Sequence, residues 1–144
     1  MLPAAALLAL AACGSGGGQS AASAKQEITT TWEAFFSPTS SNVSQLQDGT
    51  KLQAVYQAGR SNPATQTLMA KVKAVTLSSN SDCKTSLVPS PCAKVTFDLL
   101  ANGAPVLPNS SGYATKQNGK WRVSKATFCG LIALGNGGQA PPGC

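Results

Sequence analysis

Two Asn-Gly pairs, at residues 102–103 and 118–119, restrict the second half of this chain more than any other feature. Asparagine and glycine tolerate the positive φ angles that a two-residue hairpin turn requires, so such a pair between apolar runs is a strong hairpin signal. Before the first pair, the run at 94–100 alternates polar and apolar side chains from Lys94 to Leu99. This alternation is typical of a strand with one buried face, and we expect an antiparallel hairpin here.

The neighbouring segments extend this sheet. Residues 106–116 form the next expected strand, in which Pro108 indicates an edge position or a bulge because proline cannot donate a ladder hydrogen bond. After the second turn, Trp121 and Val123 alternate with polar residues, and a β-rich run at 67–77 supplies the first strand. The sequence therefore predicts a four-stranded antiparallel meander.

An amphipathic helix is expected ahead of the strands. Ser23 and Gln26 have the spacing of a helix capping box. The apolar residues that follow recur at helical spacing until Ser37-Pro38 ends the helix. These apolar residues are Ile28, Trp32, Phe35 and Phe36.

Two shorter helices should follow, at residues 43–47 and after a second capping-box spacing at Thr50 and Gln53; Asn62-Pro63 stops the latter. Helices followed by strands predict an α+β architecture, with the apolar face of the sheet curled over the first helix. The residues expected near its core are Trp32, Phe35, Phe97, Tyr113 and Trp121.

Five cysteines occur in the chain, and we expect four of them to form disulfides. If Cys13 is lipidated, three pairings of the other four are possible. Cys83 with Cys92 is favoured because the intervening stretch is short and rich in turn residues. Cys129 with Cys144 would then tie down a tail that is too rich in glycine and proline to order itself. A zinc site is excluded, since there is no histidine and no Cys-x-x-Cys spacing.

The N-terminal segment resembles a bacterial lipoprotein signal. An uncharged apolar run ends in Leu10-Ala11-Ala12-Cys13, is too short to span a bilayer, and is followed by glycines and serines. We expect a signal peptide at 1–12, a flexible linker at 13–24 and one globular domain at 25–144, held at the outer face of the cell membrane through lipidated Cys13. A signal normally begins with positive charge, which residues 1–24 lack, so the natural start is expected upstream. The alternative is an ordinary apolar helix that ends at a cysteine.

Four stretches together resemble a known family. They are Thr31-Trp32-Glu33-Ala34-Phe35-Phe36, Leu46-Gln47-Asp48-Gly49, Trp121-Arg122-Val123 and Thr127-Phe128-Cys129. The pattern is similar to the mycobacterial low-molecular-weight secreted antigen family and its actinobacterial lipoprotein relatives. The resemblance implies an exported, immunogenic protein with no catalytic residues to transfer. The order of helices and strands also resembles the cone-like fold of the nuclear transport factor two and cystatin type.

The residues needed for catalysis are scarce. The chain has no histidine and five acidic residues, and it contains no carboxylate pair, phosphate-binding loop or nucleophile motif. A buried Asp48 or Asp98 facing a polar cleft would instead indicate an enzyme. The aromatic residues either fill the core or form the wall of an apolar pocket at the mouth of the cone. The candidate pocket residues are Trp32, Phe36, Tyr56, Phe97, Tyr113 and Trp121.

These observations favour a lipid-anchored envelope protein that acts as a non-catalytic binding or interaction module without a cofactor. The first alternative is a carrier of an apolar or lipid ligand. Lys116, Lys120, Arg122 and Lys125, which we call the basic hairpin, either form a solvated face or attract anionic lipid or a protein partner. Nucleic acid binding is not expected of an exported, tethered protein.

Overall fold

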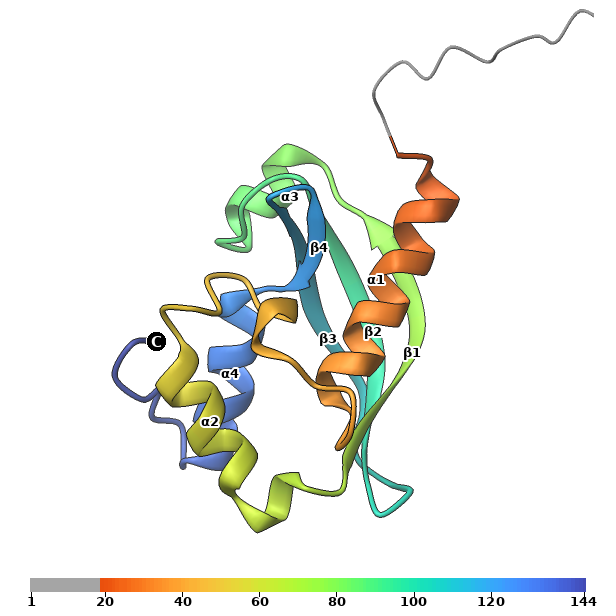
Figure 1. Ribbon diagram of the computed structural model, residues 1–144. Coiled ribbons are helices and arrows are strands. Elements are labelled where there is room, and N and C mark those ends of the chain that lie inside the picture. Colours follow the sequence, from red (N-terminus) through yellow and green to blue (C-terminus); the bar gives the residue numbers. More distant parts are fainter. Residues whose placement is uncertain (1–18) are drawn as a thin grey trace, which may run out of the picture.

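The computed structural model describes residues 19–144, which form a curled four-stranded antiparallel sheet with helices on both sides (Figure 1). The strands are β1 (Leu68–Leu77), β2 (Cys92–Ala101), β3 (Ala104–Gln117) and β4 (Lys120–Val123), paired in that order. The predicted α+β meander is confirmed. The expected signal peptide at 1–12, the lipidation site Cys13 and residues 14–18 of the expected linker lie outside the described residues.

Both Asn-Gly pairs form the turns that the sequence predicts. Asn102 and Gly103 have φ angles of 51° and 78°, and Asn118 and Gly119 have 52° and 74°. Two consecutive positive angles are the signature of the type I′ turn. Pro108 lies where β3 is paired with β2 alone, next to a register shift. It therefore occupies both an edge and a bulge, and no ladder hydrogen bond is lost.

Helix α1 (Ala21–Phe36) lies in the concave side of the sheet and begins earlier than predicted. Ser20, rather than Ser23, is the N-cap, and its hydroxyl accepts the Ser23 amide proton. Gln19 holds this first turn in place, because its side-chain oxygen accepts a hydrogen bond from the indole N–H of Trp121. The last residues of the expected linker, Ala21–Ala24, are therefore helical, and Ala24 is buried.

The remaining helices differ more from expectation. The segment at 43–47 contains a 3₁₀ turn, η1 (Val43–Gln45), and α2 (Gln53–Ser61) begins after buried Leu52, without the Thr50 cap. The short 3₁₀ helix η2 (Pro63–Thr65) then leads into β1. Two helices were not predicted: α3 (Asn80–Thr85), which contains Cys83, and α4 (Lys125–Gly135), after the sheet.

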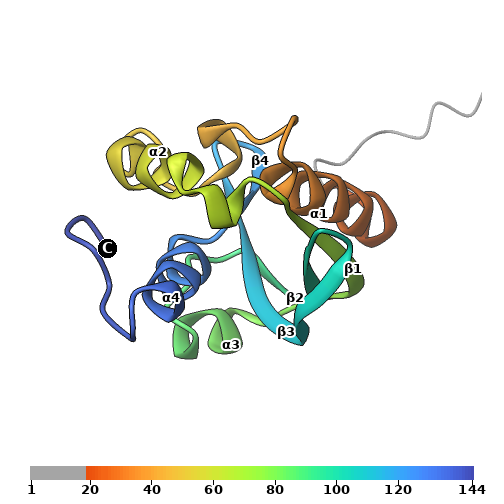
Figure 2. The same cartoon turned by 90° about the horizontal axis from the view of Figure 1, so that it is seen from below.

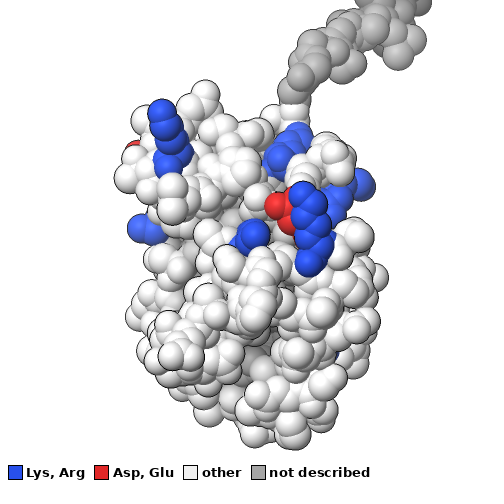
Figure 3. All heavy atoms as spheres, turned by 90° about the vertical axis from the view of Figure 1, so that its left-hand side faces the viewer, with Lys and Arg blue, Asp and Glu red and all other residues white. Residues whose placement is uncertain are grey.

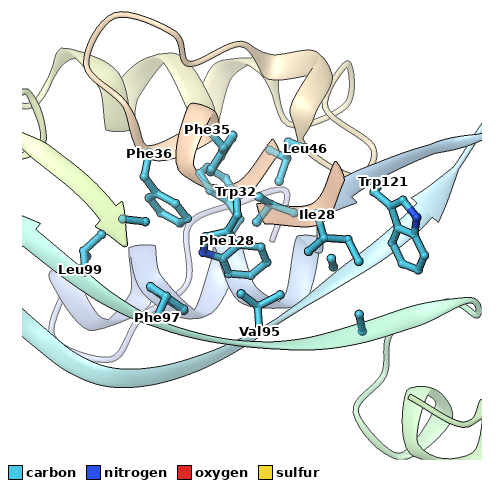
Figure 4. Close-up of a cluster of buried hydrophobic side chains, with 14 of the residues drawn as sticks. Ile28, Trp32, Phe35, Phe36, Leu46, Val95, Phe97, Leu99, Trp121 and Phe128 are labelled. Atoms are coloured by element: carbon cyan, nitrogen blue, oxygen red, sulfur yellow. The ribbon is translucent and has the colours of Figure 1, made fainter. Parts of the chain in front are cut away.

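The core lies between α1 and the concave face of the sheet (Figure 4). Ile28 and Trp32 of α1 face Val95 and Phe97 of β2, and all four are at most 1% exposed. The apolar strand face that the sequence predicts is therefore confirmed. A smaller cluster of Cys83, Val88 and Cys92 lies on the opposite face, beneath α3. Within residues 19–144, no helix combines the length and apolar character that a membrane crossing requires.

Candidate ligand cavity

An apolar cavity of about 430 Å³ opens at the end of the sheet where α1 finishes. Its walls come from the last turn of α1, from α2 and α4, and from the adjacent ends of β1, β2 and β3 (Figures 1 and 2). The side chains around it are mostly aliphatic and aromatic. They include Phe35, Phe36, Tyr56, Leu68, Leu99, Leu107, Phe128, Leu131, Ile132 and Leu134.

Aromatic residues form the inner wall. The Phe35 ring packs edge-on against Phe36 and Phe128, with centroid separations of 5.1 and 5.9 Å, and lies 5.9 Å from the Tyr56 ring. Two adjacent phenylalanines at the end of α1 therefore join α2 and α4 to the core. Edge-to-face pairs of this kind add stability beyond the burial of their area.

The outer wall covers the cavity without filling it. No residue of α2 is fully buried, and Phe128 is the one fully buried residue of α4. Leu131 and Ile132 are half-buried, and Leu134 is 67% exposed. Helix α4 is therefore apolar but only partly covered, and the cavity lies between it and the sheet.

Few polar groups reach this space. The Tyr56 hydroxyl and the Ser41 hydroxyl share a hydrogen bond of 2.8 Å, and one guanidinium nitrogen of Arg60 donates to the Pro38 carbonyl at 2.9 Å. The Thr65 hydroxyl donates to the Asn62 carbonyl at 2.8 Å. The cavity offers shape and apolar contact, and it holds no pair of acid, base or nucleophile.

A second cavity of about 400 Å³ adjoins the first across the seam between α2 and α4. The two cavities share the lining residues Gly59, Asn62, Thr65, Leu131, Ile132 and Gly135. Pro141 and Pro142 of the C-terminal tail form part of the outer wall of the second one. This tail is tied to α4 by the disulfide described below.

Both disulfides favoured by the sequence are present. Cys83 bonds to Cys92 with a Cα–Cα distance of 5.8 Å, and Cys129 bonds to Cys144 with 5.6 Å. The first pins α3 and its loop to β2. The second closes the Gly/Pro-rich tail onto α4. Among residues 19–144, no group of three potential metal ligands comes together.

Apart from Arg60, the charged residues of the described chain do not line the cavity. On the face formed by α2 and α4, lysine and arginine side chains gather in the upper half, and the lower half is almost free of charge (Figure 3). In the basic hairpin, Arg122 donates to the carbonyls of Ser44 and Gln117, so this side chain helps to hold the fold.

Glu27 of α1 lies beside the basic hairpin. Its carboxylate accepts a 2.6 Å bond from the Gln19 amide and a 3.1 Å bond from the Trp121 backbone. Burial alone would raise the pKa of Glu27, but these hydrogen bonds and the charges of Lys116 and Lys120 together hold the pKa below its ordinary value. Glu27 thus joins the start of α1 to β4.

Comparison with known families assigns the chain. A family model described as the low molecular weight antigen MTB12, C-terminal domain, matches residues 20–139, which span every helix and strand of the structure. The chain belongs to this family. No curated protein and no solved structure matches it. The family and the two disulfides indicate a place outside the cytoplasm.

The stretches that carry the resemblance to the MTB12 family are mainly core. Trp32, Phe35 and Leu46 are at most 5% exposed, as are Trp121 and Val123. Their side chains build the fold rather than a reactive site. Membership in the MTB12 family therefore reflects the fold of this chain and assigns no role to the cavity.

The six predicted pocket residues separate into three groups. Phe36 and Tyr56 line the cavity. Trp32 and Phe97 are fully buried behind Phe36, and Trp121 closes the far end of the core (Figure 4). Placing these three in a pocket was wrong, because α1 fills that part of the concave face.

Tyr113 lies on the other face of the sheet, and its predicted place in the core and the pocket was wrong. Side chains alternate along a strand. Gly112 and Ala114 face α1, so Tyr113 must face away, where it packs on the Cys83–Cys92 cluster.

The contribution of α4 to the cavity was not predicted from the sequence. Ser124 caps this helix by accepting the Thr127 amide proton, and Phe128, Leu131 and Ile132 follow at helical spacing. This cap followed by apolar residues at helical spacing is the pattern from which α4 could have been predicted. Asp48 and Asp98 do not line the cavity: Asp48 accepts a hydrogen bond from Gln117, and Asp98 accepts one from the Asn109 amide.

Proposed function

We propose that this protein is a lipid-anchored binding module outside the cytoplasm that holds an apolar ligand in the cavity beneath α2 and α4. The observation that carries the proposal is the cavity itself. Its volume of about 430 Å³ lies within the range of small-molecule sites, which are concave, mainly apolar and few in number. No catalytic step forms part of the proposal.

The size of the cavity argues against a simple packing defect. Protein interiors contain few voids larger than a water molecule. At about 24 cal/mol per Å³ of void, an enclosed empty space of about 430 Å³ would cost roughly 10 kcal/mol. That is comparable to the whole stability of a typical domain, about 5–15 kcal/mol. A space of this size is therefore better explained as an open site, which is accessible to an apolar molecule.

The place where the chain enters the domain suits an anchor at Cys13. Helix α1 has 16 residues, so its two ends are about 24 Å apart. Its first turn lies next to Trp121, and its last turn supplies Phe35 and Phe36 to the cavity. A lipid attached ahead of Ala21 would hold the protein by the end opposite the cavity, and the mouth would stay accessible.

Binding of a neutral apolar dye tests the proposal directly. N-phenyl-naphthylamine should bind the mature protein with a rise in its fluorescence and saturate at one site. Leu131→Trp places a larger side chain where the two cavities meet and should weaken dye binding at least about tenfold. The matched control is Leu87→Trp, at a position that is 86% exposed and does not line the cavity. Equal binding by both variants would contradict the proposal.

Anchoring is tested separately by Cys13→Ala. In cells, the unaltered protein should fractionate with the membrane and the variant should be released. The released variant should bind the dye as the anchored protein does, because the cavity lies within the described domain. If Cys13→Ala fractionates with the membrane as the unaltered protein does, the anchor is contradicted.

A further inference from the structure

Arg60 is the one charged residue among those that line the cavity. It lies in the last turn of α2 and is half-buried. One of its terminal nitrogens donates to the Pro38 carbonyl at 2.9 Å. A guanidinium group carries five N–H donors in a planar fork, so most of its donor capacity remains unused at the cavity wall.

No carboxylate of this chain is placed to neutralise Arg60. Within residues 19–144 the one ion pair joins Lys73 to Asp98. The chain has five acidic residues, and each is hydrogen-bonded elsewhere. Their partners are Gln19 for Glu27, the Val72 amide for Glu33, Gln117 for Asp48, Ser79 for Asp82 and the Asn109 amide for Asp98.

The surroundings increase the affinity of Arg60 for an anion. The lower half of the face in Figure 3 is almost free of charge, and apolar walls reduce the local dielectric screening around Arg60. Tyr56 lies four residues before Arg60, on the same side of α2, and also lines the cavity. The rim therefore offers a cation and a hydroxyl beside a space that is otherwise apolar.

The volume limits the apolar part of the occupant. A cavity of about 150 Å³ holds benzene, so about 430 Å³ has room for roughly seventeen carbon-sized atoms. This corresponds to one acyl chain, whereas a two-chain lipid would need more space.

We infer that the cavity takes a single-chain amphiphile whose anionic head, a carboxylate or a phosphate monoester, pairs with Arg60. The inference rests on the proposed function and adds the chemical class of the ligand. Arginine suits both head groups, because its fork matches their oxygen atoms in a bidentate way. The chain would lie against Phe36 and Phe128, and the head would remain at the rim beside Tyr56.

Displacement of N-phenyl-naphthylamine by matched competitors tests this inference. Laurate, lauryl phosphate and lauryl alcohol share one chain and differ in the head. We expect at least one of the two anions to compete about tenfold better than the alcohol. This factor corresponds to a charge-assisted hydrogen bond to Arg60 that is weakened because the site is partly exposed. The anion that competes better identifies the head group.

Two variants locate the effect. Arg60→Met keeps an unbranched apolar stem and should make the anions compete no better than the alcohol, while dye binding is retained. Lys51→Met removes an exposed charge outside the cavity and should leave the preference for anions unchanged. Dye binding by Arg60→Met also shows that the variant is folded around an intact cavity.

The outcomes separate the inference from the proposed function. If dye and alcohol bind but neither anion is preferred, the inference is overturned and the apolar site stands. A preference that persists in Arg60→Met also overturns it. If the dye, the alcohol and the anions all fail to bind the unaltered protein, the proposed function itself fails.

Discussion

Replacing Gly112 with alanine should destabilise the protein, although alanine is normally more favourable than glycine inside a strand. Gly112 lies in β3, opposite Val95, at the point where Trp32 and Thr127 approach the sheet. A β-carbon at this position would lie 2.6 Å from the Thr127 methyl carbon and 2.8 Å from the Cη2 atom of Trp32. Carbon atoms in contact prefer about 3.5–4.0 Å.

Neither neighbour can move away freely. Trp32 is fully buried, and its ring packs against Phe36 and Phe97 with centroid separations of 6.0 and 5.3 Å. The Thr127 hydroxyl accepts the Tyr113 amide proton and shares a bond with Ser124, each at 2.8 Å. Rotating Thr127 would sacrifice these two hydrogen bonds, worth about 1 kcal/mol each. Together with the usual cost of overpacking, Gly112→Ala should lose about 1–3 kcal/mol.

Urea unfolding, followed by circular dichroism, measures this loss. The matched control is Gly130→Ala, the same change in α4, where a β-carbon would meet nothing within 4 Å. Because glycine inside a helix is unfavourable, the control should gain about 0.5–1 kcal/mol. Adding Thr127→Ser to Gly112→Ala removes the closest methyl group, keeps the hydroxyl and should restore part of the loss. If Gly112→Ala unfolds at the same urea concentration as the unaltered protein, the proposed close packing of β3, α1 and α4 is wrong.

Two further predictions concern the disulfides and pH. Replacing Cys129 and Cys144 by serine should lower the free energy of unfolding by about 3 kcal/mol, because the disulfide no longer closes a 15-residue loop. The same change at Cys83 and Cys92 should lower it at least as much in urea unfolding, since both residues are buried. A smaller loss at the buried pair would contradict the role of its cluster. Glu27→Gln should destabilise the protein at about pH 7, and the difference should shrink as pH falls below 4.5. A carboxylate with a lowered pKa stabilises the fold above its ordinary pKa and loses this effect as pH falls through the folded pKa. A difference that does not depend on pH would show that charge is not involved.

Local signals were sufficient for most of the sheet. The Asn-Gly pairs determine their own turns, because few other residues tolerate two consecutive positive φ angles. The alternation at 94–100 fixed which side chains of β2 are buried, since a strand has a period of two. The two disulfide pairs followed from short separations along the chain.

Helix boundaries were less predictable, because long-range contacts decide them. Ser20 and Ser23 are both suitable caps by residue type. The contact of Gln19 with Trp121, which is 102 positions away in the chain, accompanies the earlier start. Similarly, Leu52 is buried, and α2 begins after it without the predicted side-chain cap.

The sequence by itself determined the antiparallel meander, the buried face of β2 and the disulfide pairs, because each depends on residues close together in the chain. Only the tertiary structure decided the cavity. Its walls bring together α2 and α4, which are far apart in the chain. Phe36 and Tyr56 lie at the wall, while Trp32 and Phe97 are covered. Which aromatic residues face a space depends on how far α1 extends over the sheet, and a local pattern carries no information about that distance.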